Sequence, residues 1–378
     1  MDPLDKPYLM QSDSAKKVLF IARSMRGGGA ERFLTILLRH IDRSRFIPIL
    51  SLVEKKGAFL EHLPKDIEVI DLDAGRVLYS LPWIVALVRE KRPDMVFSTI
   101  GYLSLGIAMV HPFMPRGTMI IARETNIPSI NMGQSPFPRV FRFLYRWLYP
   151  KLDKVICQSN DMMNDLVENF SFPLEKAVVI NNPVDGEEIW THAQEEKNIF
   201  PEGKVVILAA GKLMYQKGFD LLLKSMSQIR HRGFYLTILG QGPEEVNLKR
   251  LVYELDLATR VTFKGFVDNP YSYMAQADLF VLSSRFEGFP NVVLEALACG
   301  VPVVAFDCPG DIGEIIEDGV NGWKVDRGNT TAFADTIERA LAARWDRDLI
   351  KKSVEKKFGA KKIIAEYERV FLEVLDEP

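Results

Sequence analysis

Two carboxylates that frame the start of an expected helix are the side chains in this sequence best suited to chemistry. Glu287 and Glu295 stand at the two ends of the run Glu-Gly-Phe-Pro-Asn-Val-Val-Leu-Glu. Pro290 is a favourable first helical residue, because its missing N–H would have no helical partner there. The backbone N–H groups that follow, at Asn291 and Val292, are then unpaired donors at the positive end of the helix dipole, which suits a diphosphate.

The same two carboxylates complement that phosphate site. Glu287 lies in the glycine-containing loop before the helix, where it can accept hydrogen bonds from sugar hydroxyls. Glu295 lies about one turn inside the helix, within reach of a ribose. The segment therefore offers the groups that a nucleotide-sugar needs. A buried helix with a polar first turn is the alternative interpretation.

Two lysines that precede this segment in the sequence add positive charge. Lys212 and Lys217 flank the end of a strand and the start of a helix. Two cations at this spacing can stabilise a departing diphosphate, and such charge stabilisation is usually the largest catalytic contribution. Two solvated lysines would give the same pattern.

A glycine run near the N-terminus also follows an expected strand. Gly28 and Gly29, in the run 27–29, open a helix. Glycines at such a position allow a ligand to approach the backbone closely. A tight turn needed only for packing remains the alternative.

Taken together, these residues resemble the donor-site signature of the retaining glycosyltransferases of family four. The likeness rests on Glu-x7-Glu followed by Ala-Leu-Ala-x-Gly-Val-Pro-Val-Val, ending at Val304. Three further segments fit the family in the same order: Gly27-Gly-Gly-Ala-Glu-Arg32, Gly211-Lys-Leu213 with Lys217-Gly218, and Gly240-Gln-Gly-Pro243. The resemblance extends over nearly the whole chain.

The resemblance implies a two-lobed GT-B enzyme that transfers a hexose or N-acetylhexosamine from a UDP-sugar and forms an α-glycosidic bond. The implied reaction is a front-face displacement in which the leaving diphosphate helps to deprotonate the acceptor. Lys212, Lys217 and the helix amides would stabilise its charge, so neither a metal nor another cofactor is expected. The family usually carries Arg at the position of Lys212. The lysine in this sequence replaces that bidentate fork by a point charge.

The resemblance also assigns residues to the nucleotide. Gly240 would lie in the nucleotide-sugar site, and Phe266 and Val267 would lie against the nucleobase. A strand edge with an aromatic core residue is the alternative for the last two.

Composition and patterning predict the architecture. The chain has 378 residues, of which 47% are hydrophobic and 26% charged, enough for two ordinary globular domains. Short apolar runs alternate with helical patterns, which predicts α/β lobes with doubly wound parallel sheets, Rossmann-like in type. We expect a mobile tail over 1–15, an acceptor-side lobe over 16–184, a linker over 185–203 and a nucleotide-sugar lobe over 204–358. The resemblance implies that the last helix, 359–378, crosses back onto the first lobe.

Several classes of partner are disfavoured. A net charge of −2 gives no field that would attract nucleic acid. Three scattered cysteines and five histidines show no metal-ligand spacing, and so sparse a cysteine set fits a reducing cytosol. Residues 1–15 lack the apolar core of a signal peptide. The apolar stretch 100–114 is too short to span a bilayer, so we expect a buried helix there.

Three polar residues end an expected strand of the first lobe. Arg123, Glu124 and Asn126 are predicted to bind hydroxyls of the acceptor or the donor. Many relatives carry a histidine where Glu124 falls. A structural ion pair between Arg123 and Glu124 is the alternative.

A basic and aromatic helix is expected soon after. Arg139, Arg142 and Arg146 share one face at helical spacing, and aromatic and aliphatic residues occupy the rest. Such a helix can lie in a membrane interface, so we expect peripheral contact with the anionic inner face of the cytoplasmic membrane. Together with such a helix, the family resemblance implies an acceptor that is a polyprenyl-diphosphate-linked saccharide in bacterial polysaccharide, O-antigen or lipid-linked glycan assembly. Packing of the aromatic face into the lobe is the alternative.

Two rival functions fit a chain of two such lobes. A nonhydrolysing nucleotide-sugar epimerase would need no acceptor, but a histidine-rich catalytic cluster is missing. A non-catalytic two-lobed binding protein would normally be exported and would have no use for paired lysines.

Overall fold

The computed structural model describes residues 15–133, 137–229 and 233–376. The tail expected over 1–15 lies outside these residues except for its last position. The chain divides into two compact units. Of the described residues, the first unit holds 15–157, 166–178 and 364–376, and the second holds 158–165 and 179–363.

The first unit is built on a seven-stranded sheet with the order β3-β2-β1-β4-β5-β6-β7. The pairings from β3 through β6 are parallel. Its strands are β1 (Lys16–Ala22), β2 (Phe46–Leu52), β3 (Glu68–Asp71), β4 (Met95–Ser98), β5 (Met119–Arg123), β6 (Lys154–Cys157) and β7 (Ala177–Val179). The last five residues of β1 and all of β4 are buried and almost all apolar, as expected for a parallel sheet covered on both faces.

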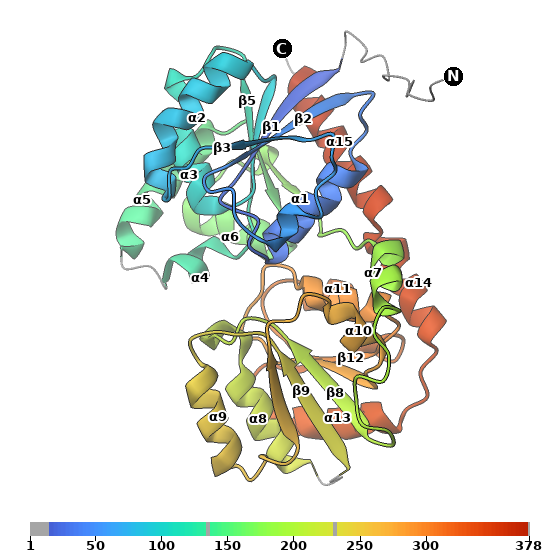
Figure 1. Ribbon diagram of the computed structural model, residues 1–378. Helices are drawn as coiled ribbons and strands as arrows, with labels where there is room; N and C mark the ends of the chain where they lie inside the picture. Colours follow the sequence, from blue (N-terminus) through green and yellow to red (C-terminus); the bar gives the residue numbers. More distant parts are fainter. Residues whose placement is uncertain (1–14, 134–136, 230–232, 377–378) are drawn as a thin grey trace, which may run out of the picture. The chain divides into compact units, whose positions relative to one another are not determined.

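Helices cover both faces of this sheet (Figure 1). They are α1 (Gly29–His40), α2 (Val77–Lys91), α3 (Gly101–Val110), α4 (Pro128–Gly133), α5 (Pro138–Leu148), α6 (Asn160–Phe170) and α15 (Ala360–Asp376), with short turns η1 (Ala58–Leu60), η2 (His111–Phe113), η3 (Tyr149–Lys151) and η4 (Leu174–Lys176). The buried helix expected within 100–114 is α3, and none of the described helices is long and apolar enough to cross a bilayer.

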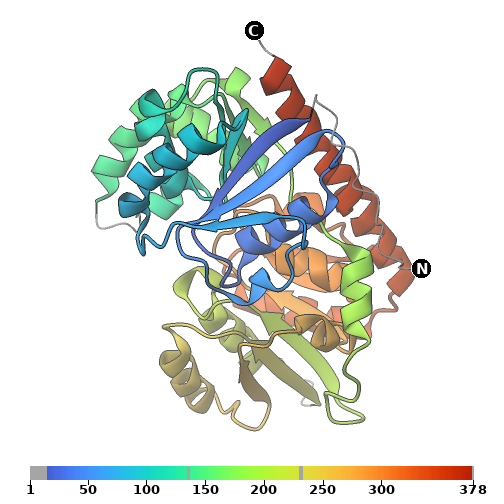
Figure 2. The same ribbon diagram turned by 45° about the horizontal axis from the view of Figure 1, so that its top comes forward.

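The C-terminal helix supplies part of the first unit's core. Figures 1 and 2 show α15 beside β1 and β2. The Phe371 ring lies 6.3 Å from that of Phe20, 5.9 Å from that of Phe46 and 5.4 Å from that of Phe97. Because Phe371 is fully buried among these rings, residues far apart in the sequence are required for one core.

The second unit is built on a six-stranded parallel sheet with the order β10-β9-β8-β11-β12-β13. Its strands are β8 (Val205–Ala210), β9 (Phe234–Leu239), β10 (Val261–Gly265), β11 (Leu279–Leu282), β12 (Val303–Asp307) and β13 (Gly322–Asp326). Its helices are α7 (Gly186–Ala193), α8 (Phe219–Gln228), α9 (Glu245–Glu254), α10 (Pro270–Ala275), α11 (Asn291–Ala298), α12 (Ile312–Ile315), α13 (Thr330–Ala342) and α14 (Arg347–Phe358).

Alternate residues of β8 face two different hydrophobic clusters. Val206 and Leu208 pack with residues of α7, α10, α11 and α14. Ile207 and Ala209 pack with residues of α8, α9 and α13. This alternation follows from the period of two in a strand and explains why the strand is apolar at every position.

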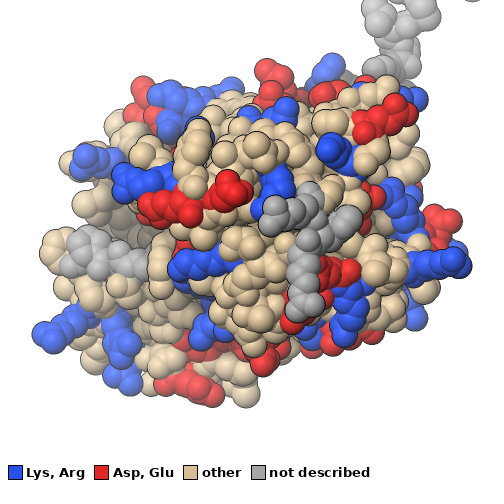
Figure 3. Space-filling view, turned by 90° about the horizontal axis from the view of Figure 1, so that it is seen from below, with Lys and Arg blue, Asp and Glu red and all other residues tan. Residues whose placement is uncertain are grey.

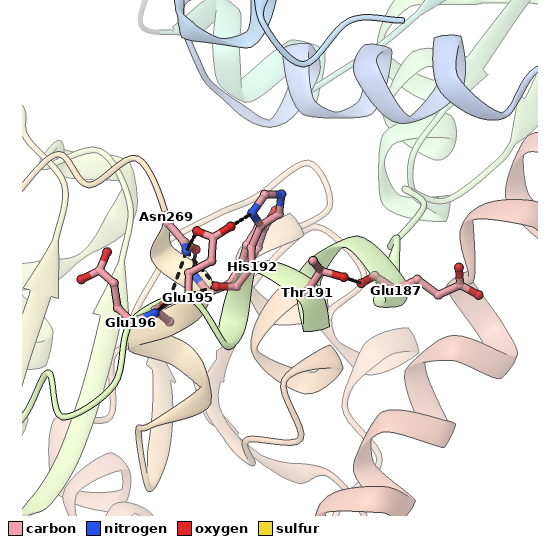
Figure 4. A network of polar contacts seen from close by, with 8 residues as sticks. Glu187, Thr191, His192, Glu195, Glu196 and Asn269 are labelled. Atoms are coloured by element: carbon pink, nitrogen blue, oxygen red, sulfur yellow. Dashed lines mark hydrogen bonds and ion pairs between the residues drawn. The ribbon is translucent and has the colours of Figure 1, made fainter.

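Part of the stretch expected as a linker, 185–203, is a helix of the second unit. Asp185 caps α7 by accepting a hydrogen bond from the Glu188 N–H at 3.2 Å. Asn269 then fastens the end of α7, because its side-chain amide donates to the His192 carbonyl at 2.8 Å and to Glu195 at 2.9 Å (Figure 4). Cap and amide contacts give this polar segment a fixed place.

We expect Phe371→Ala to destabilise the protein by about 3–5 kcal/mol, because it leaves a cavity among three aromatic rings. The matched control is Phe113→Ala, since Phe113 is 62% exposed and its truncation should cost less than about 1 kcal/mol. Urea denaturation followed by circular dichroism measures both. Equal effects of the two substitutions would show that α15 is not part of the core.

Candidate functional site

Three neighbouring strands of the second sheet each end near a glycine. Gly211 follows β8, Gly240 follows β9 and Gly265 ends β10. The Gly211 N–H donates to the Leu239 carbonyl at 2.9 Å, and the Gly240 N–H donates to the Gly265 carbonyl at 2.7 Å. A Cβ atom on Gly240 would lie only 2.0 Å from the Gly211 carbonyl oxygen. Backbone groups without side chains therefore form the carboxyl edge of these strands, where ligands of open α/β sheets bind.

Lys217 and Glu287 form an ion pair beside this edge. The Lys217 Nζ lies 2.7 Å and 2.8 Å from the two Glu287 carboxylate oxygens. The Lys217 side chain is 19% exposed and the Glu287 side chain 6%. Ser284 also donates its hydroxyl to Glu287. A Cβ on Gly211 would lie 3.5 Å from the Lys217 stem, so the lysine lies close to the glycine edge. The sequence selected both charged residues but not their pairing.

The loop after β12 fixes the backbone of Glu287. The Glu287 N–H donates to the Pro309 carbonyl at 2.8 Å. Gly310 has a φ of +119°, and a Cβ there would lie 2.6 Å from the Glu287 carbonyl oxygen. The loop can approach Glu287 this closely only because residue 310 is glycine.

The second predicted lysine, Lys212, directly follows Gly211 of the glycine edge. Lys212 is exposed and forms no hydrogen bond or ion pair with any residue that the structure describes. Of the two lysines that the sequence selected, the structure therefore brings Lys217 alone to the carboxylate.

The helix that was expected after Glu287 is α11. It begins at Asn291, with Pro290 as the preceding cap residue rather than the first helical residue. Val292 is half-buried in its first turn, and Glu295 is buried further along. Burial, together with the nearby Glu295 charge, raises the pKa of the Cys299 thiol to about 12.

Asn182 is a residue of this region that sequence reasoning missed. It is buried, and its amide donates to the Phe289 carbonyl at 3.1 Å, to the Asn291 side chain and to Gln158 at 3.0 Å. These bonds hold the segment that leads into α11. The one signal in the sequence was the break in pattern at 181–186.

The two residues predicted to contact the nucleobase differ in burial. Phe266 is exposed just beyond β10, whereas Val267 is half-buried and packs against the core. An exposed aromatic ring at the carboxyl end of a strand is available to stack on a planar ligand.

The glycine run of the first unit opens α1 as expected. Gly28 is the residue before the helix and Gly29 is its first residue, and both are exposed. Glu31 lies in the first turn, where burial raises the pKa of its carboxyl group. These residues belong to the first unit, whereas Lys217 and Glu287 belong to the second.

Arg123 and Glu124 are buried in the first unit among tyrosines. The Arg123 Nε donates to the Tyr367 hydroxyl at 3.0 Å, and burial lowers the pKa of the guanidinium. Glu124 accepts hydrogen bonds from the hydroxyls of Tyr145, at 3.2 Å, and Tyr149. Burial and the Glu124 charge keep the pKa of Tyr149 well above its usual value. Both charges have tyrosine partners, and the nearby Glu124 charge also acts on the Arg123 guanidinium.

Asn126, which follows them in the sequence, is half-buried. Its side-chain oxygen accepts a hydrogen bond from the N–H of Ile127 at 3.0 Å. That bond shapes the loop before α4, the short helix that lines a surface hollow with α5.

Helix α5 exposes its three arginines and two of its four aromatic residues. Arg139, Arg142 and Arg146 are exposed. Four large apolar residues of this segment are 54–66% exposed: Phe137, Val140, Phe143 and Trp147. Tyr145 is the buried residue of the helix. A cavity of about 300 Å³ lies between α4 and α5, and Arg139, Arg142 and Ser129 contribute to its lining. The aromatic face is therefore not packed wholly into the unit.

Charges on another face of the molecule are mixed. Figure 3 shows Lys and Arg side chains interspersed with Asp and Glu over the face that it draws. This distribution agrees with a net charge of −2.

We expect Gly240→Ala to destabilise the protein by about 3 kcal/mol or more, because its Cβ would collide with the Gly211 carbonyl and its φ of +127° disfavours side chains. Gly328→Ala is the matched control: its φ is +81° with open space around the new Cβ, so it should cost about 1–2 kcal/mol. Urea denaturation compares the two. Equal losses would mean that the conformation alone, and not the close approach, requires Gly240.

Family models match both halves of the chain. Residues 27–188 match "Glycosyltransferase Family 4" and residues 191–357 match "Glycosyl transferases group 1". Among curated proteins, the chain is 31% identical to a Campylobacter jejuni protein, N-acetylgalactosamine-N,N'-diacetylbacillosaminyl-diphospho-undecaprenol 4-alpha-N-acetylgalactosaminyltransferase, over 84% of this chain and 88% of that one. It is 34% identical to the lipopolysaccharide core biosynthesis glycosyltransferase LpsE of Rhizobium meliloti, over 84% of this chain and 86% of LpsE.

Solved structures share the fold. The structure of Anabaena Alr3699/HepE in complex with UDP-glucose superposes with a TM-score of 0.79, covering 95% of this chain and all of that one at 21% identity. Sucrose-phosphate synthase of Thermosynechococcus elongatus gives a TM-score of 0.78 at 18% identity, over 95% of this chain and 99% of the synthase. The two parallel-sheet units and the family matches lead to one conclusion: this chain belongs to the glycosyltransferases of group 1, family four, with the GT-B fold.

Proposed function

We propose that the chain is a retaining transferase that moves a hexose or N-acetylhexosamine from a UDP-sugar to a hydroxyl of a polyprenyl-diphosphate-linked saccharide. The new glycosidic bond is α. The observation that carries this proposal is the Lys217–Glu287 pair beside the bare carboxyl edge of β8, β9 and β10. That edge admits a nucleotide, the lysine supplies a cation for its diphosphate, and the carboxylate accepts hydrogen bonds from a sugar.

The names of relatives support the two substrates. The Campylobacter relative is named for a diphospho-undecaprenol acceptor and an N-acetylgalactosaminyl group. The Anabaena neighbour was solved with UDP, and again with UDP-glucose. A lipid-linked diphosphate acceptor and a UDP-sugar donor are therefore the pair to test first.

The reaction that fits these groups needs no covalent intermediate. The bond between the anomeric carbon and the diphosphate oxygen breaks, and the acceptor oxygen bonds to that carbon from the same face. The acceptor's proton passes to the leaving diphosphate. Lys217 stabilises the charge on that diphosphate, with the N–H groups at Asn291 and Val292 as further donors and Glu295 at the ribose. A metal or another cofactor has no required part in this scheme.

An apolar and basic surface of the first unit supports contact with a membrane. Besides the exposed residues of α5, helix α2 exposes Leu78, Tyr79 and Trp83, each by 61–67%. Helix α3 packs against both α2 and α5. Aromatic residues and arginines gathered in this way suit the interface of an anionic bilayer, so peripheral binding to the inner face of the cytoplasmic membrane is part of the proposal.

The decisive experiment incubates the protein with UDP-sugars, with and without an undecaprenyl-diphosphate-linked saccharide, and measures release of UDP. Release that requires the acceptor and persists in EDTA supports a metal-independent transferase. Isomerisation of the sugar without acceptor would identify an epimerase, and binding without turnover would identify a non-catalytic protein. Loss of activity in EDTA that Mg²⁺ or Mn²⁺ restores would contradict the metal-free scheme.

We expect Glu295→Ala to weaken UDP binding about 10- to 100-fold, because ribose hydroxyls lose a charged acceptor worth roughly 1.5–3 kcal/mol. Glu287→Ala should instead reduce turnover and discrimination among UDP-sugars more than affinity for free UDP. Isothermal titration with UDP, combined with kcat for each donor, separates the two roles. Equal effects of Glu287→Ala on UDP and UDP-sugar affinity would remove Glu287 from the sugar site.

The variant in which Arg139, Arg142 and Arg146 are all replaced by Gln should lose affinity for anionic liposomes, at about 1 kcal/mol per basic residue. Added salt should weaken wild-type binding in the same assay. Activity should fall on a lipid-linked acceptor but not on a short soluble analogue, and UDP affinity should stay unchanged. Replacing the exposed Arg344 of the second unit by Gln is the control. Undiminished liposome binding by the triple variant would refute the role of α5.

A further inference from the structure

The short turn that carries Lys217 is held by the segment just before Glu287. This turn, η5 (Tyr215–Lys217), has three residues and connects β8 to α8. The Arg285 N–H donates to the Gln216 carbonyl at 2.7 Å, and the Gln216 amide donates to the Phe286 carbonyl at 3.1 Å. The Ser283 hydroxyl donates to the Lys217 carbonyl at 2.9 Å. The backbone carbonyls of Gln216 and of Lys217 itself are thus tied to 283–286.

The side chain of Arg285 adds further contacts to η5. We call these contacts, together with those of 283–286, the clamp. Its Nη1 donates to the Tyr215 carbonyl at 2.8 Å, and its guanidinium lies 4.1 Å from the centre of the Tyr215 ring. Two parallel hydrogen bonds of 2.8 Å join the same guanidinium to both oxygens of Asp220. One planar group therefore binds η5 on one side and the first turn of α8 on the other.

Asp220 holds the guanidinium in that orientation. It lies in the first turn of α8, where the helix dipole favours a carboxylate. Although its burial opposes ionisation, hydrogen bonds from Arg285 lower the pKa of Asp220 overall, and the pair raises the pKa of Arg285. Both groups stay ionised across the neutral range, so the clamp does not depend on physiological pH.

Lysine could not replace arginine in this clamp. An ammonium group cannot form the two parallel bonds to Asp220 while it also donates to the Tyr215 carbonyl and stacks on the ring. A conservative Arg285→Lys change would therefore keep the charge but remove the guanidinium's contacts with Tyr215 and Asp220, leaving η5 held only by the bonds to 283–286. Since Lys217 is the last residue of η5, its ammonium would be held less firmly beside the glycine edge.

We propose that Arg285, oriented by Asp220, is a positioning residue that sets the Lys217 ammonium for the diphosphate of the donor. Arg285 itself touches no substrate. This inference rests on the proposed function, because it acts through Lys217 and the nucleoside diphosphate that Lys217 would bind. It adds two residues that the sequence motif does not contain, and it explains why a lysine at the end of so short a turn is well placed.

The test uses UDP and UMP as probes, since they differ by the second phosphate. Kd for each is measured by isothermal titration for the wild type, Lys217→Ala, Arg285→Lys, Asp220→Asn and the double variant Lys217→Ala/Arg285→Lys. Lys217→Ala should reduce the preference for UDP over UMP about tenfold or more. Arg285→Lys should produce a loss in the same direction, with UMP affinity and melting temperature near those of the wild type.

The double variant is the critical comparison. If Arg285 acts through Lys217, Arg285→Lys should cause no further loss of UDP preference once Lys217 is alanine. Arg339→Lys is the matched control, because Arg339 also stacks on an aromatic ring of the second unit, 4.1 Å from the Trp323 centre, but does not contact η5. It should leave the UDP preference unchanged.

Two results would overturn the positioning role alone. One is an unchanged UDP preference in Arg285→Lys. The other is a double variant whose loss of UDP preference equals the product of the two single-variant losses. If UMP affinity falls as much as UDP affinity, Arg285 serves the fold in general and the proposal fails. If Lys217→Ala leaves the preference intact, both the position of Lys217 in the proposed function and this inference fail. ADP and GDP, compared with their monophosphates, extend the test should the wild type bind no uridine nucleotide.

Discussion

A buried carboxylate needs a partner, and Glu287 is the group around which the second unit's site is arranged. Leaving it unpaired in so enclosed a position would cost several kcal/mol. Lys217 and Ser284 satisfy its oxygens, while Pro309 and Gly310 fit its backbone. The loop before α11, the turn η5 and the loop after β12 are thereby tied to a single charged side chain.

The same ion pair balances the two charges of the site against each other. Lys217 is half-buried beside a carboxylate, so its charge is compensated by Glu287 until another anion arrives. In the proposed reaction, the donor brings both an anion for the lysine and hydroxyls for the carboxylate. Binding would then exchange one set of charged partners for another, which favours a ligand that supplies both.

In the first unit, the buried charges bond to tyrosine hydroxyls, whereas Glu287 bonds to a side chain of opposite charge. Arg123 and Glu124 have tyrosine partners drawn from α15, α5 and η3, so the polar groups join distant segments within one core. Tyr145 thus anchors α5 from its buried side, while the helix presents aromatic and basic residues outward. An internal polar contact therefore supports the outward face on which the proposed membrane contact depends.

The sequence by itself determined the alternation of strands and helices, since parallel strands covered on both faces need continuous apolar runs. It also selected Glu287, Glu295 and Lys217 as candidates, because motif spacing is local. It placed Pro290 one residue too deep in the helix and took α7 for linker. Only the tertiary structure decided the pairing of Lys217 with Glu287, seventy positions apart, the contacts of Asn182 and Arg285, and the burial of Arg123 and Glu124. Those contacts depend on which strand ends lie side by side: β11 adjoins β8, although β9 and β10 separate them in the sequence.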